Sequence, residues 1–271
     1  MRKQNQEKRL QSFYFQHPLL WGIATAMLIS FCWNASSSTA YGAKTHPLTP
    51  AVKVAKRSLK AARKVDAFTA NFSKWEMVGG KLLPKSSMAM KWRAKPLSVY
   101  FKFQNIHKGR EVIYVEGKND GNLLVHEAGI KSIVGTLSFA PTAKRVMSET
   151  RYPITRSGLT KMVEGVIEQW EKEMDYGDVK VKYYKNAKLN GRACRVVETF
   201  HPTRRKEFAF YKTRLYIDAK TILPICVQQY AFPVSKGGKP PLVEEYQYFN
   251  IKTDVELKDI DFDKGNPAYG F

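Results

Sequence analysis

Residues 86–104, SSMAMKWRAKPLSVYFKFQ, alternate between apolar and polar side chains on both sides of a proline. A period of two is typical of a strand with one buried face and one solvated face. Pro96 has no backbone N–H for a sheet hydrogen bond, so it separates two neighbouring strands. Together the two strands place six apolar side chains on one continuous face: Met88, Met90, Trp92, Val99, Phe101 and Phe103.

Further short strands are predicted along most of the remaining chain, in segments that turn residues such as Asn190-Gly191 separate. These segments are 68–73, 110–116, 122–127, 131–137, 178–186, 192–200, 206–217, 222–232 and 242–252. Short strands joined by tight turns form antiparallel meanders. The sequence therefore predicts one α+β domain with an antiparallel sheet of about ten strands.

Two segments change to helical periodicity. In residues 49–66 small apolar side chains recur every three or four positions among lysines and arginines, and Thr49-Pro50 is typical of a helix start. This helix either packs on the core or lies on a membrane surface, and its small apolar residues favour the core. The second helix is predicted over 158–175, ending before Gly177.

The N-terminal residues 1–40 have the pattern of a secretory signal peptide. A basic start is followed by the apolar run 18–33 and by a stretch of small residues, NASSSTAYGA. Cleavage is expected near Ala40 or Ala43, which leaves a domain of residues 41–271 in the periplasm or secreted. The alternative is an uncleaved anchor, but the run is shorter than the roughly 20 residues that a spanning helix needs.

The chain is strongly basic, with a formal net charge of +21. Without residues 1–40 it keeps 41 basic and 23 acidic residues, a net charge of +18. Outside the cytoplasm such a charge favours anionic lipid headgroups or acidic polymers as partners, although it also serves general solubility. The basic residues are spread along the chain rather than clustered, which argues against nucleic acid.

Two cysteines, Cys194 and Cys226, follow the predicted cleavage site. They lie on strands that a third predicted strand separates, which places them roughly 10 Å apart. A disulfide needs Cα atoms within about 7 Å. Two buried thiols are therefore expected, with a disulfide as the alternative in an oxidising compartment.

No motif for catalysis, a metal or a cofactor stands out. The histidines His46, His107, His126 and His201 lack ligand spacing, and no serine lies in a Gly-x-Ser-x-Gly turn. The alternating Asp259, Asp261 and Asp263 lack the further ligands of a calcium loop. We therefore predict a protein that is not an enzyme. Three convergent polar residues with perturbed pKa values in one cleft would argue for an enzyme instead.

The face formed by Met88, Met90, Trp92, Val99, Phe101 and Phe103 is the candidate ligand site. Its simplest role is to form the hydrophobic core beneath the helices. A curved sheet can serve both purposes, with part of the face packed and part open to an apolar ligand. Methionine suits such a surface because its unbranched side chain repacks around different ligands.

Several segments resemble an uncharacterised secreted family that is placed beside the periplasmic lipoprotein-carrier superfamily of LolA and RseB. They are 92–103 (WRAKPLSVYFKF), 109–117 (GREVIYVEG), 151–159 (RYPITRSGL), 217–224 (IDAKTILP) and 260–271 (IDFDKGNPAYGF). The order of signal peptide, basic helix, F-T-A-x-F strand (68–72) and Lys95-Pro96 resembles the carriers themselves. The resemblance implies an open, curved half-barrel with helices packed in its concave face. It offers Arg93 as the counterpart of the carriers' cavity arginine.

Secretion, the apolar strand face and the missing catalytic motifs predict a non-enzymatic binding protein of the cell envelope. Its ligand is expected to be a lipid, a lipoprotein or another amphiphile, with an anionic membrane surface as a further partner. The alternative is a structural or sensory module that binds an acidic polymer or protein without a small ligand.

Overall fold

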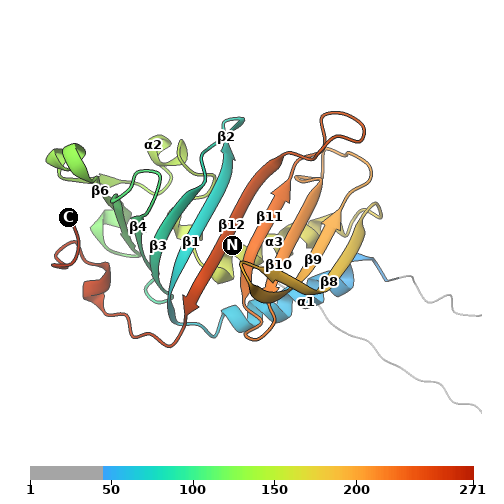
Figure 1. The fold of residues 1–271 in the computed structure, drawn as a ribbon, viewed down its shortest axis with the longest axis horizontal. Helices are drawn as coiled ribbons and strands as arrows, with labels where there is room; N and C mark the ends of the chain where they lie inside the picture. The colour runs from blue at the N-terminus through green and yellow to red at the C-terminus, as the bar shows by residue number, and fades with distance from the viewer. Residues whose placement is uncertain (1–44) are drawn as a thin grey trace, which may run out of the picture. The chain divides into compact units, whose positions relative to one another are not determined.

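The computed structural model describes residues 45–271, so the predicted signal peptide and its cleavage site lie outside the described residues. In this part of the chain, every strand belongs to one antiparallel sheet of 12 strands (Figure 1). The strands are β1 (Ala67–Val78), β2 (Lys81–Leu82), β3 (Ser86–Arg93), β4 (Ser98–Phe103), β5 (Glu111–Val115), β6 (Leu123–His126), β7 (Thr136–Phe139), β8 (Lys180–Leu189), β9 (Arg192–Phe200), β10 (Lys212–Asp218), β11 (Pro224–Tyr230) and β12 (Leu242–Lys252).

The strand order is β7-β6-β5-β4-β3-β1-β12-β11-β10-β9-β8, with β2 paired to β1 outside this path. Two meanders meet where β12 pairs with β1, and the sheet stays open because β7 and β8 form its two edges. The predicted class, an α+β fold with one open, curved antiparallel sheet, is confirmed.

The described residues also form three α-helices and four short 3-10 helices. The α-helices are α1 (Leu48–Ala62), α2 (Lys144–Met147) and α3 (Leu159–Glu173). The 3-10 helices are η1 (Asn119–Gly121), η2 (Gly129–Val134), η3 (Ile154–Arg156) and η4 (Asp259–Phe262). None of the helices within residues 45–271 has both the length and the apolar character to cross a bilayer.

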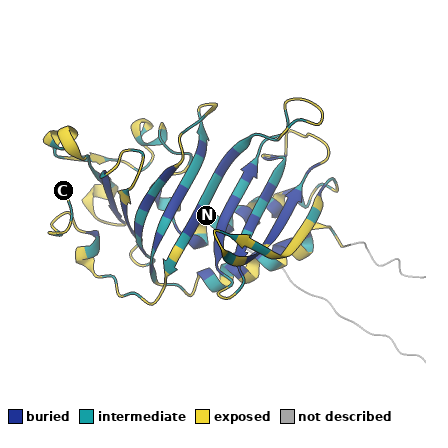
Figure 2. Cartoon of the chain, in the orientation of Figure 1, coloured by how far each residue is buried: buried dark blue, intermediate teal, exposed yellow. Residues whose placement is uncertain are grey.

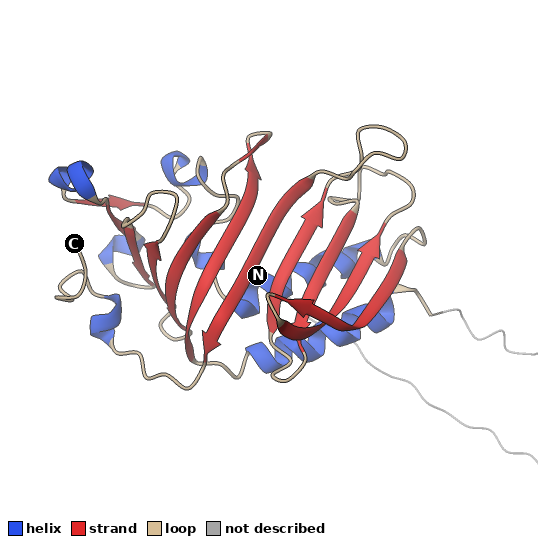
Figure 3. Cartoon of the chain, viewed as in Figure 1, coloured by secondary structure: helices blue, strands red, loops and turns tan. Residues whose placement is uncertain are grey.

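Helices α1 and α3 pack together against the β9–β12 half of the sheet (Figure 3). Their buried side chains include Val52, Ala55, Val163 and Trp170, which pack on strand residues such as Leu215. The small and aliphatic stripes predicted for both helices therefore face the core, as the first alternative for residues 49–66 required. The banding of the strands in Figure 2 shows the same alternation between buried and more exposed residues.

The C-terminal segment covers β4–β6 on the face of the sheet opposite to α1 and α3. Tyr269 stacks on Tyr100 with ring centroids 4.1 Å apart, and Phe262 is buried beside Ile113. Asp261 pairs with Lys91 at 2.5 Å, and this ion pair fastens the C-terminal segment to the sheet.

The structure corrects three boundaries. The segment predicted as a strand over 131–137 is largely the helix η2, and β7 starts only at Thr136. Gly129 and Gly135, both with positive φ, turn the backbone out of the sheet on either side of η2. Residues 206–211 precede β10 rather than belonging to it, and α1 begins at Leu48 without a side-chain cap from Thr49.

Cys194 on β9 and Cys226 on β11 are free and buried, with β10 between their strands as predicted. Burial raises the pKa of both thiols, so neither is a ready thiolate. We expect a maleimide to label both cysteines after unfolding without reductant, as a mass shift of two adducts. Labelling that appears only after reduction would contradict this strand order.

Candidate functional site

A cavity of about 600 Å³ begins over the half of the sheet that α1 and α3 leave uncovered and extends along α3 to β11. Most of its surface is apolar. Apolar side chains of β1 and β3–β7 contribute to its wall: Phe72, Met88, Phe101, Phe103, Val112, Leu123, Val125, Leu137 and Phe139. Val146, Ile154 and Met162 face them from the connection between β7 and α3 and from α3 itself.

The six residues of the candidate site share one face, as predicted. The register pairs Met88 with Phe103, Met90 with Phe101, and Trp92 with Val99. Met88, Phe101 and Phe103 line the cavity. Met90, Trp92 and Val99 are buried in the adjoining core and lie outside the cavity wall.

The face divides because the chain before α3 packs over the end of β3. Trp92 stacks on Phe68 with centroids 5.1 Å apart, and its Nε1 donates to the Ser157 carbonyl at 3.2 Å. Gly158, at φ 108°, lies so close to the Trp92 ring that a Cβ there would be 2.7 Å from it. The Trp92 end of the face is therefore closed, and the Phe103 end stays open.

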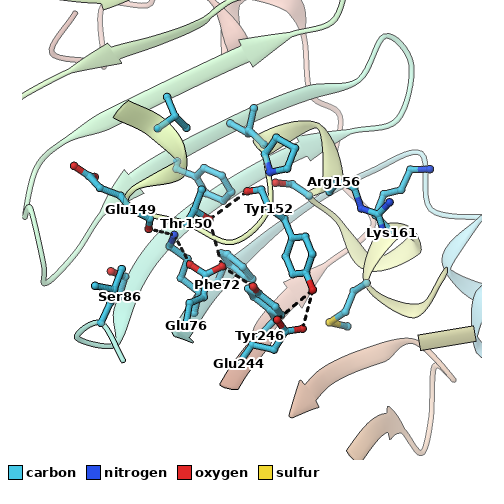
Figure 4. A pocket seen from close by; sticks show the side chains of 18 of the residues that line it. Phe72, Glu76, Ser86, Glu149, Thr150, Tyr152, Arg156, Lys161, Glu244 and Tyr246 are labelled. Carbon is cyan, nitrogen blue, oxygen red and sulfur yellow. Dashed lines mark hydrogen bonds and ion pairs between the residues drawn. The ribbon is translucent and has the colours of Figure 1, made fainter. Parts of the chain in front are cut away.

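One side of the cavity is polar and is built by residues 148–153, which we call the strap (Figure 4). The strap crosses β1 and β12, where two buried carboxylates, Glu76 and Glu244, face each other in the register. Arg151 Nε pairs with Glu244 Oε2 at 2.6 Å, and the Tyr152 hydroxyl donates to the same carboxylate at 3.2 Å.

The second carboxylate, Glu76, is equally engaged. It accepts hydrogen bonds from the Arg151 backbone N–H at 3.2 Å, from Thr150 Oγ1 at 3.3 Å and from the Tyr246 hydroxyl. Lys74 Nζ lies 2.8 Å from Glu76 and also donates to the Glu149 carbonyl at 2.9 Å. These bonds fix the strap over the sheet and keep the polar wall in place.

Arg110 extends the network toward the apolar end. Its guanidinium lies 2.6 Å from both Glu149 of the strap and Glu127, and it covers the ring of Phe103. Burial raises the pKa of Glu149, but the hydrogen bond from Arg110 and the nearby positive charges together outweigh it, so the pKa is lowered. Glu149 is therefore ionised at neutral pH.

Glu244 behaves differently because it is almost fully buried. Burial and, to a smaller extent, the nearby charge of Glu76 raise its pKa to about 7, against the opposing charge of Arg151. Burial and the Glu244 charge also raise the pKa of Tyr152 to about 12. Burial and both carboxylates raise the pKa of Tyr246, so both hydroxyls remain protonated donors.

The far end of the cavity lies beneath α3, where a second polar cluster is buried. Gln169 Nε2 donates to Glu173 at 2.8 Å, and Gln169 accepts a hydrogen bond from Gln229. Glu173 lies 3.2 Å from His201, and the neighbouring Trp170 donates to Thr199 at 3.1 Å. These contacts anchor α3 to β9–β11.

Arg93, the residue that the resemblance offered for a cavity arginine, lies on the opposite face of the sheet. Its guanidinium pairs with Asp259 at 2.8 Å and covers the Phe262 ring. The strand alternation explains this, since Arg93 follows the inward-facing Trp92. The arginines that line the cavity are Arg110, Arg145 and Arg156, and Arg151 pairs with the lining residue Glu244. Residues 45–271 contain no group of three or more His, Cys, Asp or Glu side chains that could hold a metal ion.

Sequence reasoning missed the polar wall. The sequence did contain a signal for it. Glu76 is an even number of residues from Phe68 and Phe72, and Glu244 from Tyr246 and Tyr248, so both glutamates face the inner side of the sheet like these aromatic residues. Charged residues at inward strand positions need buried partners. Their partners in the strap, however, are far away in the sequence and follow no periodic pattern.

Comparison with solved structures finds distant similarity. MucB is 13% identical with a TM-score of 0.45, over 80% of this chain and 64% of MucB. The lipoprotein LppX of Mycobacterium tuberculosis is 13% identical with a TM-score of 0.44, over 78% of this chain and 100% of LppX. A LolA superfamily protein of Nitrosomonas europaea is 12% identical with a TM-score of 0.30, over 78% and 97%.

No curated protein matches the sequence. A family model does match, over residues 65–271, and its description is "Protein of unknown function (DUF1571)". These residues include every strand of the sheet and the whole strap. The resemblance to an uncharacterised family is thereby confirmed, and the chain belongs to the DUF1571 family.

Proposed function

We propose that this protein is a non-enzymatic binding protein for a lipid, a lipoprotein acyl chain or another amphiphile of the cell envelope. The observation that carries the proposal is the mostly apolar cavity of about 600 Å³ that begins over the uncovered half of the sheet. This volume is in the range of small-molecule sites, about 300–1,000 Å³. Exposed apolar surface of this kind is costly unless a ligand covers it.

The two parts of the cavity suit the two parts of an amphiphile. Phe101, Phe103, Val125 and Leu137 offer apolar contacts to an acyl chain. Beside the polar wall, the exposed side chains of Arg156 and Lys161 line the cavity and offer positive charge to a headgroup. The signal-peptide pattern of residues 1–40 supports a place in the periplasm or outside the cell for the domain that follows.

The Glu76–Glu244 cluster does bring perturbed polar groups together, the arrangement that would favour an enzyme. The oxygens of both carboxylates, however, accept bonds from the strap, from Lys74 or from tyrosine hydroxyls. A general base or nucleophile needs access to its substrate. The observed bonds give these groups a structural role, which supports binding rather than catalysis.

Filling the cavity tests the proposal. Leu137 on β7 lines the cavity, whereas its neighbour Ser138 is exposed on the other face. We expect Leu137→Trp to weaken uptake of a fluorescent fatty-acid probe by about tenfold or more, because the indole occupies the space of the ligand. The matched control Ser138→Trp should bind the probe like the unmodified protein. The measurement is a probe titration, with thermal unfolding to show that both variants fold.

Equal probe binding by both variants would contradict a ligand site in this cavity. Absence of binding by the unmodified protein, for fatty acids and phospholipids alike, would leave the alternative of an envelope module without a small ligand.

A further inference from the structure

Antiparallel pairing brings five connections of the chain to one end of the sheet, and we call them the rim loops. They are 79–85, 104–110, 127–135, 201–211 and 231–241. Their common position follows from the register, which pairs Glu76 with Glu244 and Glu111 with His126. Two of them touch, since a Cβ on Gly109 would come within 2.7 Å of the Ala128 Cβ. They form the upper edge of the molecule in Figure 1.

The rim loops carry the most exposed aliphatic side chains of the described residues. Ile130, Ile133 and Val134 of η2 are 89%, 86% and 67% exposed, and Val234 is 94% exposed. The η2 residues show as a largely exposed tip at the upper left of Figure 2. Three exposed aliphatic side chains grouped on one short helix are not favoured in water, and such a group is typical of an interaction site.

The rim loops are also the basic end of the sheet. They contain ten basic residues and two acidic ones, a net charge of +8. The strand-to-strand connections at the opposite end, 94–97, 116–122, 190–191 and 219–223, contain three basic and two acidic residues, a net charge of +1. Lys131 lies within η2 itself, and Lys236 and Lys239 follow Val234, all of them exposed.

The cavity reaches this end of the sheet. Rim-loop residues Leu83, Ile106, His107 and Glu207 belong to its lining, and no residue of the opposite connections does. A partner that covers the rim loops therefore also lies next to these cavity-lining residues.

We propose that the rim loops dock on a bilayer surface that carries anionic headgroups. The aliphatic tips enter the boundary between headgroups and acyl chains, and the surrounding lysines and arginines contact the headgroups. Isolated aliphatic tips among basic residues fit this boundary, where apolar and anionic groups lie next to each other. The proposal of docking is supported by the exposed aliphatic side chains and the basic residues alone. A role of docking in the exchange of an amphiphile depends in addition on the proposed function.

Vesicle sedimentation tests this docking. The full domain is mixed with vesicles of phosphatidylcholine alone or of phosphatidylcholine with phosphatidylglycerol. We expect binding to the anionic vesicles that weakens with salt, because surface charges are screened. The triple change Ile130→Ser, Ile133→Ser and Val134→Ser should weaken that binding by about tenfold or more, since it removes the apolar contacts. The control is Ile260→Ser, at an exposed isoleucine of the 3-10 helix η4 outside the rim loops.

Probe uptake without vesicles is measured on the same proteins and separates the two proposals. Vesicle binding without probe uptake supports docking and contradicts the proposed function. Probe uptake without vesicle binding contradicts docking alone. Equal vesicle binding by the triple variant and the unmodified protein also overturns the proposal. So does equally tight binding to soluble polyglutamate, because it would show that charge alone, as on an acidic protein, is recognised.

Discussion

Replacing Phe68 by alanine is expected to lower the free energy of unfolding by about 3–5 kcal/mol. Phe68 is fully buried, stacks on Trp92 and packs edge-on against Tyr248 with centroids 6.0 Å apart. The loss is a large share of a typical stability of about 5–15 kcal/mol. Urea unfolding of the purified domain measures it.

Phe103→Ala is the matched variant on the same inner face. Phe103 is only half-buried and lines the cavity, so it has fewer protein contacts to lose. We expect it to destabilise the protein much less than Phe68→Ala and to weaken fatty-acid probe uptake instead. Phe101 lies between these cases, because it lines the cavity but also stacks on Phe72 at 5.8 Å. Similar destabilisation by Phe68→Ala and Phe103→Ala, with unchanged probe uptake, would show that this face is core throughout.

Replacing Glu244 by glutamine is expected to change how stability depends on pH. The pKa of Glu244 is about 7 in the folded protein, above the ordinary value of 4.5, so the folded state binds more protons than the unfolded state between these pH values. The stability that this proton provides is complete below pH 4.5 and is lost as the pH rises through 7. The difference corresponds to about 3 kcal/mol at 1.36 kcal/mol per pH unit.

Glu244→Gln has no carboxyl to titrate but keeps a hydrogen-bonding side chain for Arg151 and Tyr152. We therefore expect its stability to fall less than that of the unmodified protein between pH 4.5 and pH 8, in urea unfolding across this range. Glu256→Gln, at an exposed position, is the control and should follow the unmodified protein. The same fall in Glu244→Gln as in the unmodified protein would contradict an uncharged, buried Glu244 at mildly acidic pH.

Local periodicity predicted most of the architecture. Alternation on β3 and β4 predicted the shared inner face, and the three- and four-residue spacing in α3 predicted the side chains that pack on the sheet. Such patterns work because each strand or helix buries one side. The strand prediction for residues 131–137 failed because so short a segment of mixed apolar and polar residues does not distinguish a strand from an exposed 3-10 helix between two glycines.

The division of the inner face into core and cavity was beyond the sequence. Trp92 and Phe103 lie on the same face of the sheet, on neighbouring strands. The chain before α3 covers Trp92 but leaves Phe103 open to the cavity. The strap was missed for a related reason, since Arg151 meets Glu244 across 93 residues of chain. Neither contact follows from a local pattern.

Native mass spectrometry of the purified protein shows whether the cavity holds an amphiphile. The full chain is produced in a bacterium with its N-terminal segment, purified from the envelope and sprayed intact, with lipid analysis of an organic extract. We predict a complex of one protein with one amphiphile, which Ser138→Trp keeps and Leu137→Trp loses. A ligand site in the cavity would be contradicted by three results together: only the mass of the protein alone, an extract free of amphiphile, and no uptake of added fatty acids or phospholipids.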